Sequence, residues 1–294
     1  VYNKELGELR MHKTLFKIVA LSALLASTTA CAGTFGEKYD GRHKDLTYSE
    51  KKYTVKNSIY MPKVANGGAV LFLPSCPSVQ RFNEGDIKNN WVNPLLEQGY
   101  VVAITDYNEG RNASRPWNCG KNKHLSQSRL LRDVFNGVQA LANVPGVDRN
   151  KIFTMGTSLG AMVGATAISN HSIKSAEKIG WATPRAHVAL YGGCSYPSAT
   201  YLTSSVARPV LWMVGTNDVE MGTGCNEWLY NSVIEAQPDS VFVTYKGATH
   251  CWDCKQIDGF TKNTYYGTQT YTYDKDVTNK SQEETFTFFR KFMK

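Results

Sequence analysis

Residues 151–168 read KIFTMGTSLGAMVGATAI, and this stretch decides the fold class of the chain. Its first part is typical of a short buried strand, and the small residues that follow Leu159 are typical of a closely packed helix. Gly156-Thr157-Ser158-Leu159-Gly160 joins the two parts and matches the pattern G-x-S-x-G. Between a strand and a helix, this pattern predicts a sharp turn that presents the serine hydroxyl at the end of the strand. A glycine-rich turn with a capping serine is the alternative interpretation.

Strands and helices alternate on both sides of this stretch. The apolar patterns predict strands near residues 53–60, 69–73, 100–105, 151–155, 187–191, 210–214 and 241–245, and helices near 87–98, 130–141, 159–169 and 282–293. Such alternation predicts a mostly parallel central sheet with helices on both faces. The stretch between the strand at 187–191 and Pro209 is short, so no large lid is expected there. No linker divides the chain, and residues 46–294 are interpreted as a single domain.

Composition excludes several classes of protein. The chain has 294 residues, of which 42% are hydrophobic, so it can bury a full core. Its net charge of +8 is spread along the sequence without a basic run, and no nucleic-acid partner is expected. No apolar run reaches the length that crosses a bilayer, so no membrane domain is predicted.

The N-terminal region has the pattern of a secretory signal. Met11 precedes two lysines, an apolar run at 18–26 and small residues that end at Cys31. This pattern predicts a signal peptide at 11–31, followed by a polar tether at 32–45. Residues 1–10 contain acidic residues and are interpreted as a translated leader that is not native; an extended signal n-region is the alternative.

Export is therefore expected, to the periplasm, the medium or the bacterial envelope. Thr28-Thr29-Ala30-Cys31 resembles a lipobox, whose cysteine carries a lipid after cleavage. Plain cleavage after Ala30 or Ala32 is the competing interpretation. A membrane contact is expected only through such an anchor at Cys31.

Ser158 needs a base to become a nucleophile, and His250 is the candidate. His250 follows the strand at 241–245, whereas the other histidines lie in a core strand or in polar segments. Asp218 follows the strand at 210–214 and is the candidate for orienting His250. The chain order serine, aspartate, histidine is that of the α/β-hydrolase fold. Glu220 and Asp253 are the rival carboxylates.

Two backbone N–H groups are expected to bind the oxyanion of an acyl-transfer reaction. One belongs to Leu159, directly after the nucleophile, and the other to Cys76, in the loop after the strand at 69–73. Pro77 has no N–H and cannot donate.

The chain resembles the dienelactone hydrolase family of α/β-hydrolases, and its exported relatives in particular. The matching segments are LFLPSC, GYVVAITDYNEGR, VDRNKIFTMGTSLGAM, ALYGGC, PVLWMVGTND and VTYKGATHCWD. The resemblance implies one α/β-hydrolase domain with Ser158, Asp218 and His250 as a catalytic triad. Dienelactone hydrolases proper use cysteine where this chain has Ser158, and they carry a glycine-rich loop where this chain reads PSCPS at 74–78.

These features predict a serine hydrolase that cleaves small carboxylic esters through an acyl-enzyme, without a cofactor or a metal. The expected partner is a small ester, and the oligomeric state is left open. A serine peptidase of the prolyl-oligopeptidase type and a non-catalytic surface protein on the same fold are the alternatives. Arg111 lies where relatives have an arginine near the substrate, although an ion pair with Asp106 or Asp133 explains it equally well. Tyr107 and Trp252 are aromatic candidates for contacting the substrate.

The number of cysteines supports export. Setting Cys31 aside leaves six cysteines, an even number that allows three disulfides. Strand adjacency predicts the pairs Cys76–Cys119 and Cys194–Cys225. The two remaining cysteines, Cys251 and Cys254 of the C-x-x-C loop, are expected to pair with each other. A redox motif or half of a metal site is the rival interpretation of Cys251 and Cys254, but no second ligand pair stands at metal-site spacing.

Overall fold

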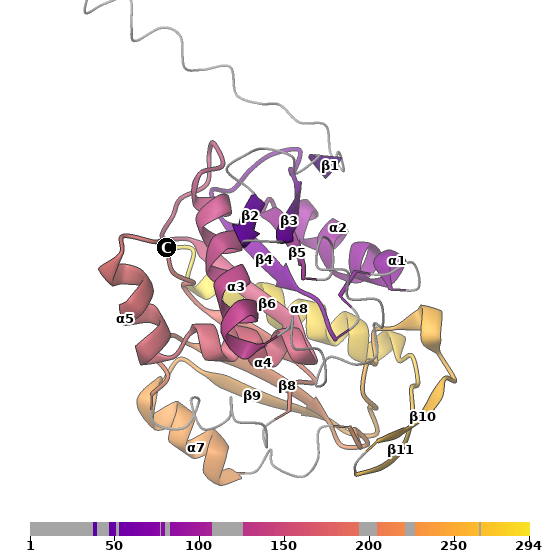
Figure 1. The fold of residues 1–294 in the computed structure, drawn as a ribbon. Coiled ribbons are helices and arrows are strands. Elements are labelled where there is room, and N and C mark those ends of the chain that lie inside the picture. The colour runs from indigo at the N-terminus through magenta and orange to yellow at the C-terminus, as the bar shows by residue number, and fades with distance from the viewer. Residues whose placement is uncertain are drawn as a thin grey trace, which may run out of the picture. The chain divides into compact units, whose positions relative to one another are not determined.

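One large β-sheet organises the computed structural model (Figure 1). The structure describes residues 38–39, 47–50, 53–76, 78–79, 83–107, 126–193, 205–220, 227–264 and 266–294. Within these residues, nine strands pair in the order β1-β3-β5-β4-β6-β7-β8-β9, and β2 pairs with β3 at one side. The strands are β1 (Lys38–Tyr39), β2 (Thr47–Glu50), β3 (Tyr53–Tyr60), β4 (Ala69–Leu73), β5 (Val101–Asp106), β6 (Ile152–Thr157), β7 (His187–Leu190), β8 (Val210–Gly215) and β9 (Val241–Tyr245).

The sheet is parallel from β5 to β9 and antiparallel where β3 joins β5. The prediction of a mostly parallel sheet is confirmed. The parallel strands share one direction, so the loops that follow β4, β6, β7, β8 and β9 all leave from the same edge. We call this the carboxyl edge and the opposite one the amino edge.

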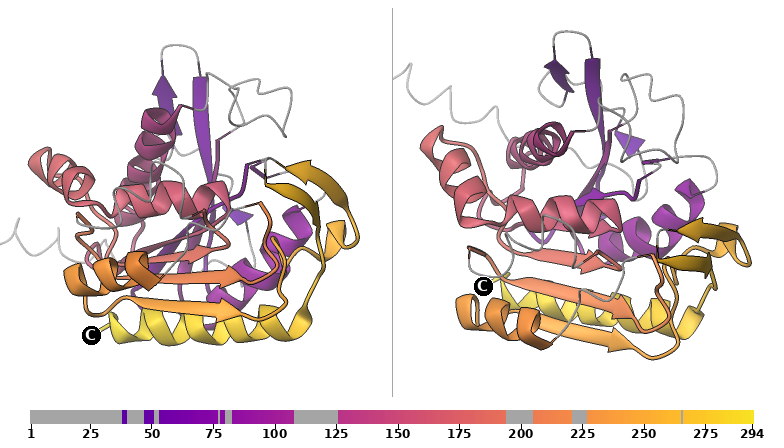
Figure 2. Two further views of the ribbon diagram at one scale, coloured as in Figure 1. Left: turned by 90° about the horizontal axis from the view of Figure 1, so that it is seen from below. Right: turned by 60° about the horizontal axis from the view of Figure 1, so that its bottom comes forward.

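Helices cover both faces of the sheet, as Figure 2 shows. They are α1 (Glu84–Ile87), the π-helical turn Lys88–Val92, α2 (Asn93–Glu97), α3 (Gln127–Ala142), α4 (Leu159–Ala167), α5 (Asn170–Lys178), α7 (Glu227–Ala236), the 3₁₀ turn Lys255–Ile257 and α8 (Lys275–Lys291).

Successive side chains of β4 point to opposite faces of the sheet. Val70 and Phe72 pack in the cluster that also contains residues of α2 and α8, whereas Leu71 and Leu73 pack in the cluster of α3 and α4. A third cluster on the second face joins α4 and α7 to β8. Burial of both faces explains why these strands read as continuous apolar runs in the sequence.

Several elements differ from the sequence-based expectation. The helix expected at 87–98 begins at Glu84 and contains the π-helical turn. The last helix begins at Lys275 rather than near residue 282, because the Asp274 side chain accepts a hydrogen bond from the Val277 N–H and caps it. The helices α5 and α7 were not predicted. A hairpin of β10 (Thr261–Thr264) and β11 (Gly267–Thr270) was also missed.

Two residues of the expected tether at 32–45 belong to the sheet. Lys38 and Tyr39 form β1 and pair with Tyr60 and Ile59 of β3, whose outer edge would otherwise leave backbone groups unpaired. The predicted leader and signal peptide lie outside the described residues. In the part of the chain that the structure describes, no helix is both long enough and apolar enough to cross a membrane.

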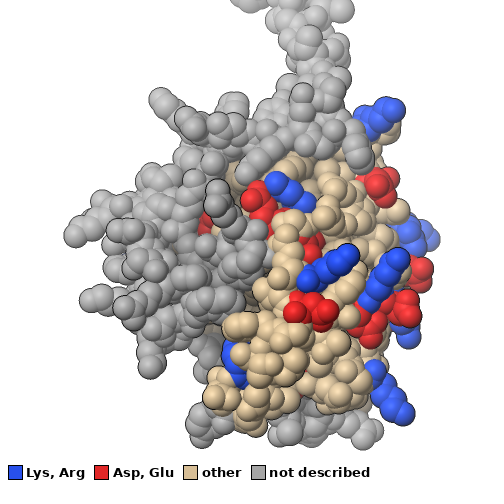
Figure 3. Space-filling model, turned by 90° about the vertical axis from the view of Figure 1, so that its right-hand side faces the viewer, with Lys and Arg blue, Asp and Glu red and all other residues tan. Residues whose placement is uncertain are grey.

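Charges are mixed on the face that carries the β10–β11 hairpin. Figure 3 shows lysine and arginine side chains lying beside aspartate and glutamate side chains on this face. The ion pairs Lys88–Glu84 and Lys262–Glu220 are examples from the described residues. Among the described residues of this face, basic side chains therefore do not form a continuous stripe (Figure 3).

Candidate active site

Ser158 stands on a strained turn between β6 and α4. Its backbone has φ +51° and ψ −114°, a conformation that residues other than glycine rarely adopt. The turn brings the backbones of neighbouring elements very close together. A Cβ at Gly160 would collide with the carbonyl oxygen of Leu73, and a Cβ at Gly156 would collide with the backbone of Gly160. The two glycines of the G-x-S-x-G pattern are therefore required by close packing around Ser158.

Ser158, His250 and Asp218 form a continuous chain of hydrogen bonds. The Nε2 of His250 lies 3.1 Å from the Ser158 hydroxyl, and its Nδ1 lies 2.8 Å from a carboxylate oxygen of Asp218. Only 4% of the His250 side chain and 5% of the Asp218 side chain are exposed, whereas Ser158 as a whole is 8% exposed. All three side chains of this hydrogen-bonded chain are therefore largely shielded from water.

Backbone bonds tie the loop of Asp218 to the loop of His250. The Asn217 N–H donates to the carbonyl of Ala248, and the Gly247 N–H donates to the hydroxyl of Thr216. Gly215 lies so close to Ala248 that a side chain there would strike the Ala248 carbonyl. Because β8 and β9 are neighbours, these bonds fix the spacing between the carboxylate and the imidazole.

The β10–β11 hairpin holds the same acid loop from outside. The side-chain oxygen of Gln269 accepts a 2.7 Å hydrogen bond from the Val219 N–H. The Lys262 ammonium lies 2.8 Å from Glu220, and the Tyr271 hydroxyl donates to the other oxygen of that carboxylate. Sequence reasoning missed this hairpin, although alternating threonine and aromatic residues around Gly267 are a hairpin signal.

Glu220, one of the two rival carboxylates, lies beside the reactive side of His250. Its nearest oxygen is 3.9 Å from Nε2, the nitrogen that faces Ser158, and not beside Nδ1. Glu220 therefore acts on the imidazole through charge rather than through the orienting hydrogen bond.

Asp253, the other rival, belongs to a separate buried network. It accepts hydrogen bonds of 2.6 Å from the Trp91 indole and 2.7 Å from the Tyr191 hydroxyl. Burial raises the pKa of Asp253 more than these two hydrogen bonds lower it. The ring of Tyr191 packs edge-on against the His250 ring, with 4.8 Å between the ring centres. The network of Asp253 therefore supports the imidazole through Tyr191, without a hydrogen bond to Nδ1.

Opposing influences set the pKa of His250. Burial, the largest, lowers it, but the charge and hydrogen bond of Asp218 together with the charge of Glu220 raise it, and Lys262 lowers it slightly. The net result is a pKa above the ordinary histidine value. A group of this kind can accept a proton from the serine hydroxyl near it.

Both aromatic candidates for substrate contact are wrong in this structure. Tyr107 is fully buried, and its hydroxyl donates a 2.8 Å hydrogen bond to the carbonyl of Pro74. Trp252 is also fully buried, packed edge-on against Tyr191 and Tyr245. Both side chains turn into the core, where they support site loops instead of facing a ligand. Arg111, the third candidate, lies outside the described residues.

The two expected oxyanion donors follow neighbouring strand ends. Leu159 is the first residue of α4, where backbone N–H groups have no partner within the helix. Cys76 lies three residues beyond Leu73, which pairs with Gly156 at the base of the Ser158 turn. The loop of Cys76 is anchored by Ser78, whose hydroxyl donates to Asp106 at 2.7 Å and accepts from the Tyr107 N–H at 3.1 Å.

Disulfide-bonded cysteines lie in two loops of the candidate site, the loop after β4 and the loop after His250. Cys251 and Cys254 are joined to each other directly after His250. Cys76 is also disulfide-bonded, and its predicted partner Cys119 lies outside the described residues, as do Cys194 and Cys225. Cys251, Asp253 and Cys254 are close enough to suggest a metal site, but sulfurs bonded to each other offer no thiolate ligand.

The sheet order, the strained serine turn and the positions of the loops define an α/β-hydrolase fold. The model of the dienelactone hydrolase family matches residues 58–293, and the chain belongs to this family of hydrolases. A search of curated proteins found no significant match.

Solved structures share the fold at low sequence identity. A dienelactone hydrolase-like promiscuous phosphotriesterase from metagenomic libraries is 14% identical, with a TM-score of 0.61, and covers 87% of this chain and 98% of its own. The dienelactone hydrolase of Anabaena variabilis is 15% identical, with a TM-score of 0.58 and coverages of 88% and 99%. The propionate-bound esterase Est2 of Thermogutta terrifontis is 13% identical, with a TM-score of 0.61 and coverages of 88% and 94%.

Proposed function

We propose that this protein is a serine hydrolase that cleaves small carboxylic esters, with Ser158 as nucleophile, His250 as base and Asp218 as the orienting acid. One observation carries the proposal. The hydrogen bonds of 2.8 Å and 3.1 Å link the three side chains in the order that the chemistry needs. They do so at the carboxyl edge of the sheet of a dienelactone hydrolase family member.

The reaction is acyl transfer to water. His250 takes the proton of Ser158 as the serine oxygen attacks the ester carbonyl, and the resulting oxyanion accepts hydrogen bonds from the N–H groups of Leu159 and Cys76. His250 then gives the proton to the leaving alcohol, so an acyl-enzyme remains. A water molecule, deprotonated by His250, attacks this acyl group and releases the acid and free Ser158.

Small acyl groups are the proposed substrates. The proposal rests on the short connection between β7 and β8, which leaves no room for a large lid domain. It is in keeping with the structures of Est2, which is described with propionate and with butyrate bound. That esterase is also described as phosphonylated by cyclosarin, so organophosphorus reagents are suitable probes for the present protein.

A fluorophosphonate probe tests the nucleophile directly. We expect one covalent adduct per chain, located on Ser158 by peptide mass spectrometry, and no adduct in Ser158→Ala. Ser169, a buried serine that caps α5, provides the control Ser169→Ala, which should still be labelled. Labelling of another residue, or none in folded protein, would refute the assignment.

A substrate panel separates the remaining alternatives. Acetyl, propionyl and butyryl esters should be hydrolysed faster than palmitoyl esters, and prolyl peptides should not be cleaved. Cleavage of the peptides alone would favour a peptidase. Labelling without turnover of any ester or peptide would point to a protein that keeps the fold but not the activity.

Export is proposed from the N-terminal pattern alone. Expressed in a bacterium with its own N-terminal region, the protein should be found in the envelope or the medium. If Cys31 carries a lipid, an alkyne-tagged fatty acid should label the wild type and not Cys31→Ala. Soluble, unlabelled exported protein would instead favour plain cleavage after Ala30 or Ala32.

A further inference from the structure

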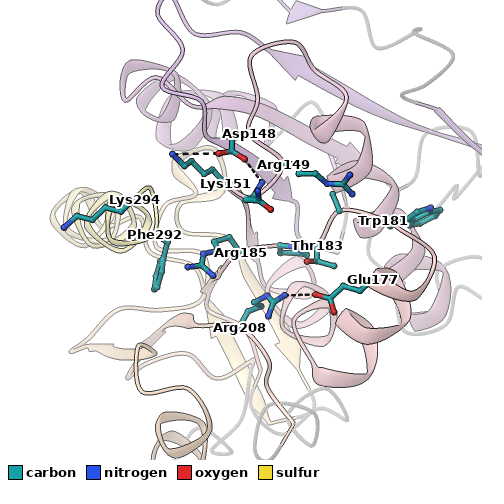
Figure 4. A pocket seen from close by; sticks show the side chains of 13 residues that line it. Asp148, Arg149, Lys151, Glu177, Trp181, Thr183, Arg185, Arg208, Phe292 and Lys294 are labelled. Carbon is teal, nitrogen blue, oxygen red and sulfur yellow. Dashed lines mark hydrogen bonds and ion pairs between the residues drawn. The ribbon is translucent and has the colours of Figure 1, made fainter.

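A cavity of about 600 Å³ lies at the amino edge of the sheet, on the side opposite Ser158. Its walls come from the residues that precede β6, β7 and β8 and from the end of α8, as Figure 4 shows. Lys151 precedes β6, and Ser158 follows its other end, so the full length of the strand separates the cavity from the triad. The cavity is therefore a place in the molecule that the proposed ester hydrolysis does not use.

Basic side chains outnumber acidic ones in the walls of this cavity. Five of the lining residues are lysine or arginine and two are acidic. Each acid is matched to one base: Glu177 lies 2.9 Å from Arg208, and Asp148 lies 3.9 Å from Lys151. The remaining lining bases are Arg149, Arg185 and Lys294.

Two arginines keep donors for a ligand. Among the described residues, no carboxylate lies within ion-pair distance of Arg149 or Arg185. Arg149 donates one hydrogen bond of 3.0 Å to the carbonyl of Gly180, and Arg185 stands 5.9 Å from the centre of the Phe292 ring. Neither contact neutralises the charge of a guanidinium.

We propose that this cavity binds a small soluble molecule that carries phosphate groups, with Arg149 and Arg185 as its main anchors. Guanidinium groups bind phosphate through paired, charge-assisted hydrogen bonds, which suits two arginines without carboxylate partners. The volume falls within the range of small-molecule sites. A hollow of this size favours a compact ligand, because a membrane surface or a nucleic acid needs an extended basic face.

Isothermal titration of the full chain with inorganic pyrophosphate tests this proposal. We expect saturable binding of one pyrophosphate per chain, and about tenfold weaker binding by Arg185→Gln or Arg149→Gln. Glu177→Gln should tighten binding, because it removes a negative charge and releases Arg208. Arg290→Gln is the matched control, since Arg290 is an exposed arginine of α8 outside the cavity. It should bind within about twofold of the wild type.

Several outcomes would overturn the proposal. These are an absence of saturable pyrophosphate binding, an equal loss of affinity in Arg290→Gln and Arg185→Gln, or capture by phosphatidylglycerol vesicles without any binding of pyrophosphate. The last would indicate a lipid headgroup as the ligand. Ester turnover and fluorophosphonate labelling should be unchanged in Arg185→Gln, so failure of this proposal is distinguishable from failure of the proposed hydrolase activity.

Discussion

Two buried histidines in this protein have opposite surroundings. His187 begins β7 and is enclosed by neutral groups: Nε2 lies 3.0 Å from the Ala161 carbonyl and Nδ1 lies 3.0 Å from the Thr154 hydroxyl. Burial lowers its pKa to about 4. His250 is almost as buried, but the carboxylates beside it raise its pKa above the ordinary value. Burial alone thus lowers the pKa of a histidine, whereas adjacent carboxylates raise the pKa of one that is nearly as buried.

Packing reinforces this contrast. The ring of His187 occupies the space that a side chain at Gly164 would need, so it fills a gap between β7 and α4. His250 contacts Ser158 at the edge of the sheet, where a substrate carbonyl can approach. His187 is therefore expected to matter for stability, and His250 for turnover.

The largest expected effect is the loss of turnover when the reacting pair is removed. Ser158→Ala and His250→Ala should each lower ester turnover by roughly three orders of magnitude or more, because both proton transfer and acyl-enzyme formation are lost. Steady-state kinetics with a short-chain nitrophenyl ester measures this effect, and circular dichroism checks folding. If His187→Gln proved as inactive as His250→Ala while still folded, the comparison of the two histidines would fail.

The second-largest expected effect is the loss of turnover when the carboxylate of Asp218 is replaced. Asp218→Asn should reduce turnover by about two to four orders of magnitude with little change in fold, since the amide can hold the imidazole in the wrong tautomer. Glu220→Gln and Asp253→Asn remove one carboxylate each and serve as matched controls. A greater loss in either control would show that Asp218 has been assigned the wrong role.

The acid stability of the protein should depend on His187. Because its pKa falls from 6.5 to about 4 on folding, the neutral form contributes stability that is complete above pH 6.5 and lost as pH falls toward 4. The shift corresponds to roughly 3 kcal/mol of unfolding free energy. Urea unfolding at pH 7.5 and pH 4 should show a smaller pH-dependent loss in His187→Gln than in the wild type. An equal loss in both would indicate that His187 is not protonated on unfolding.

The smallest effect is a shift of the pH–rate profile. His250 must be neutral to act as a base, so activity should rise with pH through a pKa above the ordinary histidine value. Glu220→Gln removes a carboxylate near Nε2 and should move this rise to lower pH, whereas Lys262→Met should move it to higher pH. Shifts of about half a pH unit in opposite directions are expected in kcat/KM. Shifts of the same sign would argue for a change of structure instead of a change of charge.

Local patterns were sufficient where the chain forms its structure from neighbouring residues. KIFTMGTSLG combines a strand, a strained turn and a helix start in ten residues, and the structure places Ser158 at that turn. The positions of Asp218 and His250 followed from the rule that loops after parallel strands share one edge. Their hydrogen bonds depend on β8 and β9 being neighbours, which the alternation of elements made reasonable.

The aromatic candidates show where such reasoning ends. Tyr107 directly follows β5, and Trp252 lies in the turn beyond β9, two residues after His250. Beside a strand, as at Tyr107, successive side chains point to opposite sides, and a displacement of one residue exchanges core for surface. In a turn, as at Trp252, no periodicity indicates the direction of the side chain. The sequence carries no mark of which side each one takes, so only the packed structure shows that both turn inward.

The sequence by itself determined the class of fold and the three residues that meet at the carboxyl edge, because strand pattern, turn chemistry and chain order are local properties. Tertiary structure alone decided the surroundings that give those residues their chemistry. The hairpin that holds Glu220 beside His250 comes from residues far along the chain, and the cavity at the amino edge joins three loops and a helix end. Electrostatic effects depend on distance in space, and distances between remote segments are fixed only when the whole core packs.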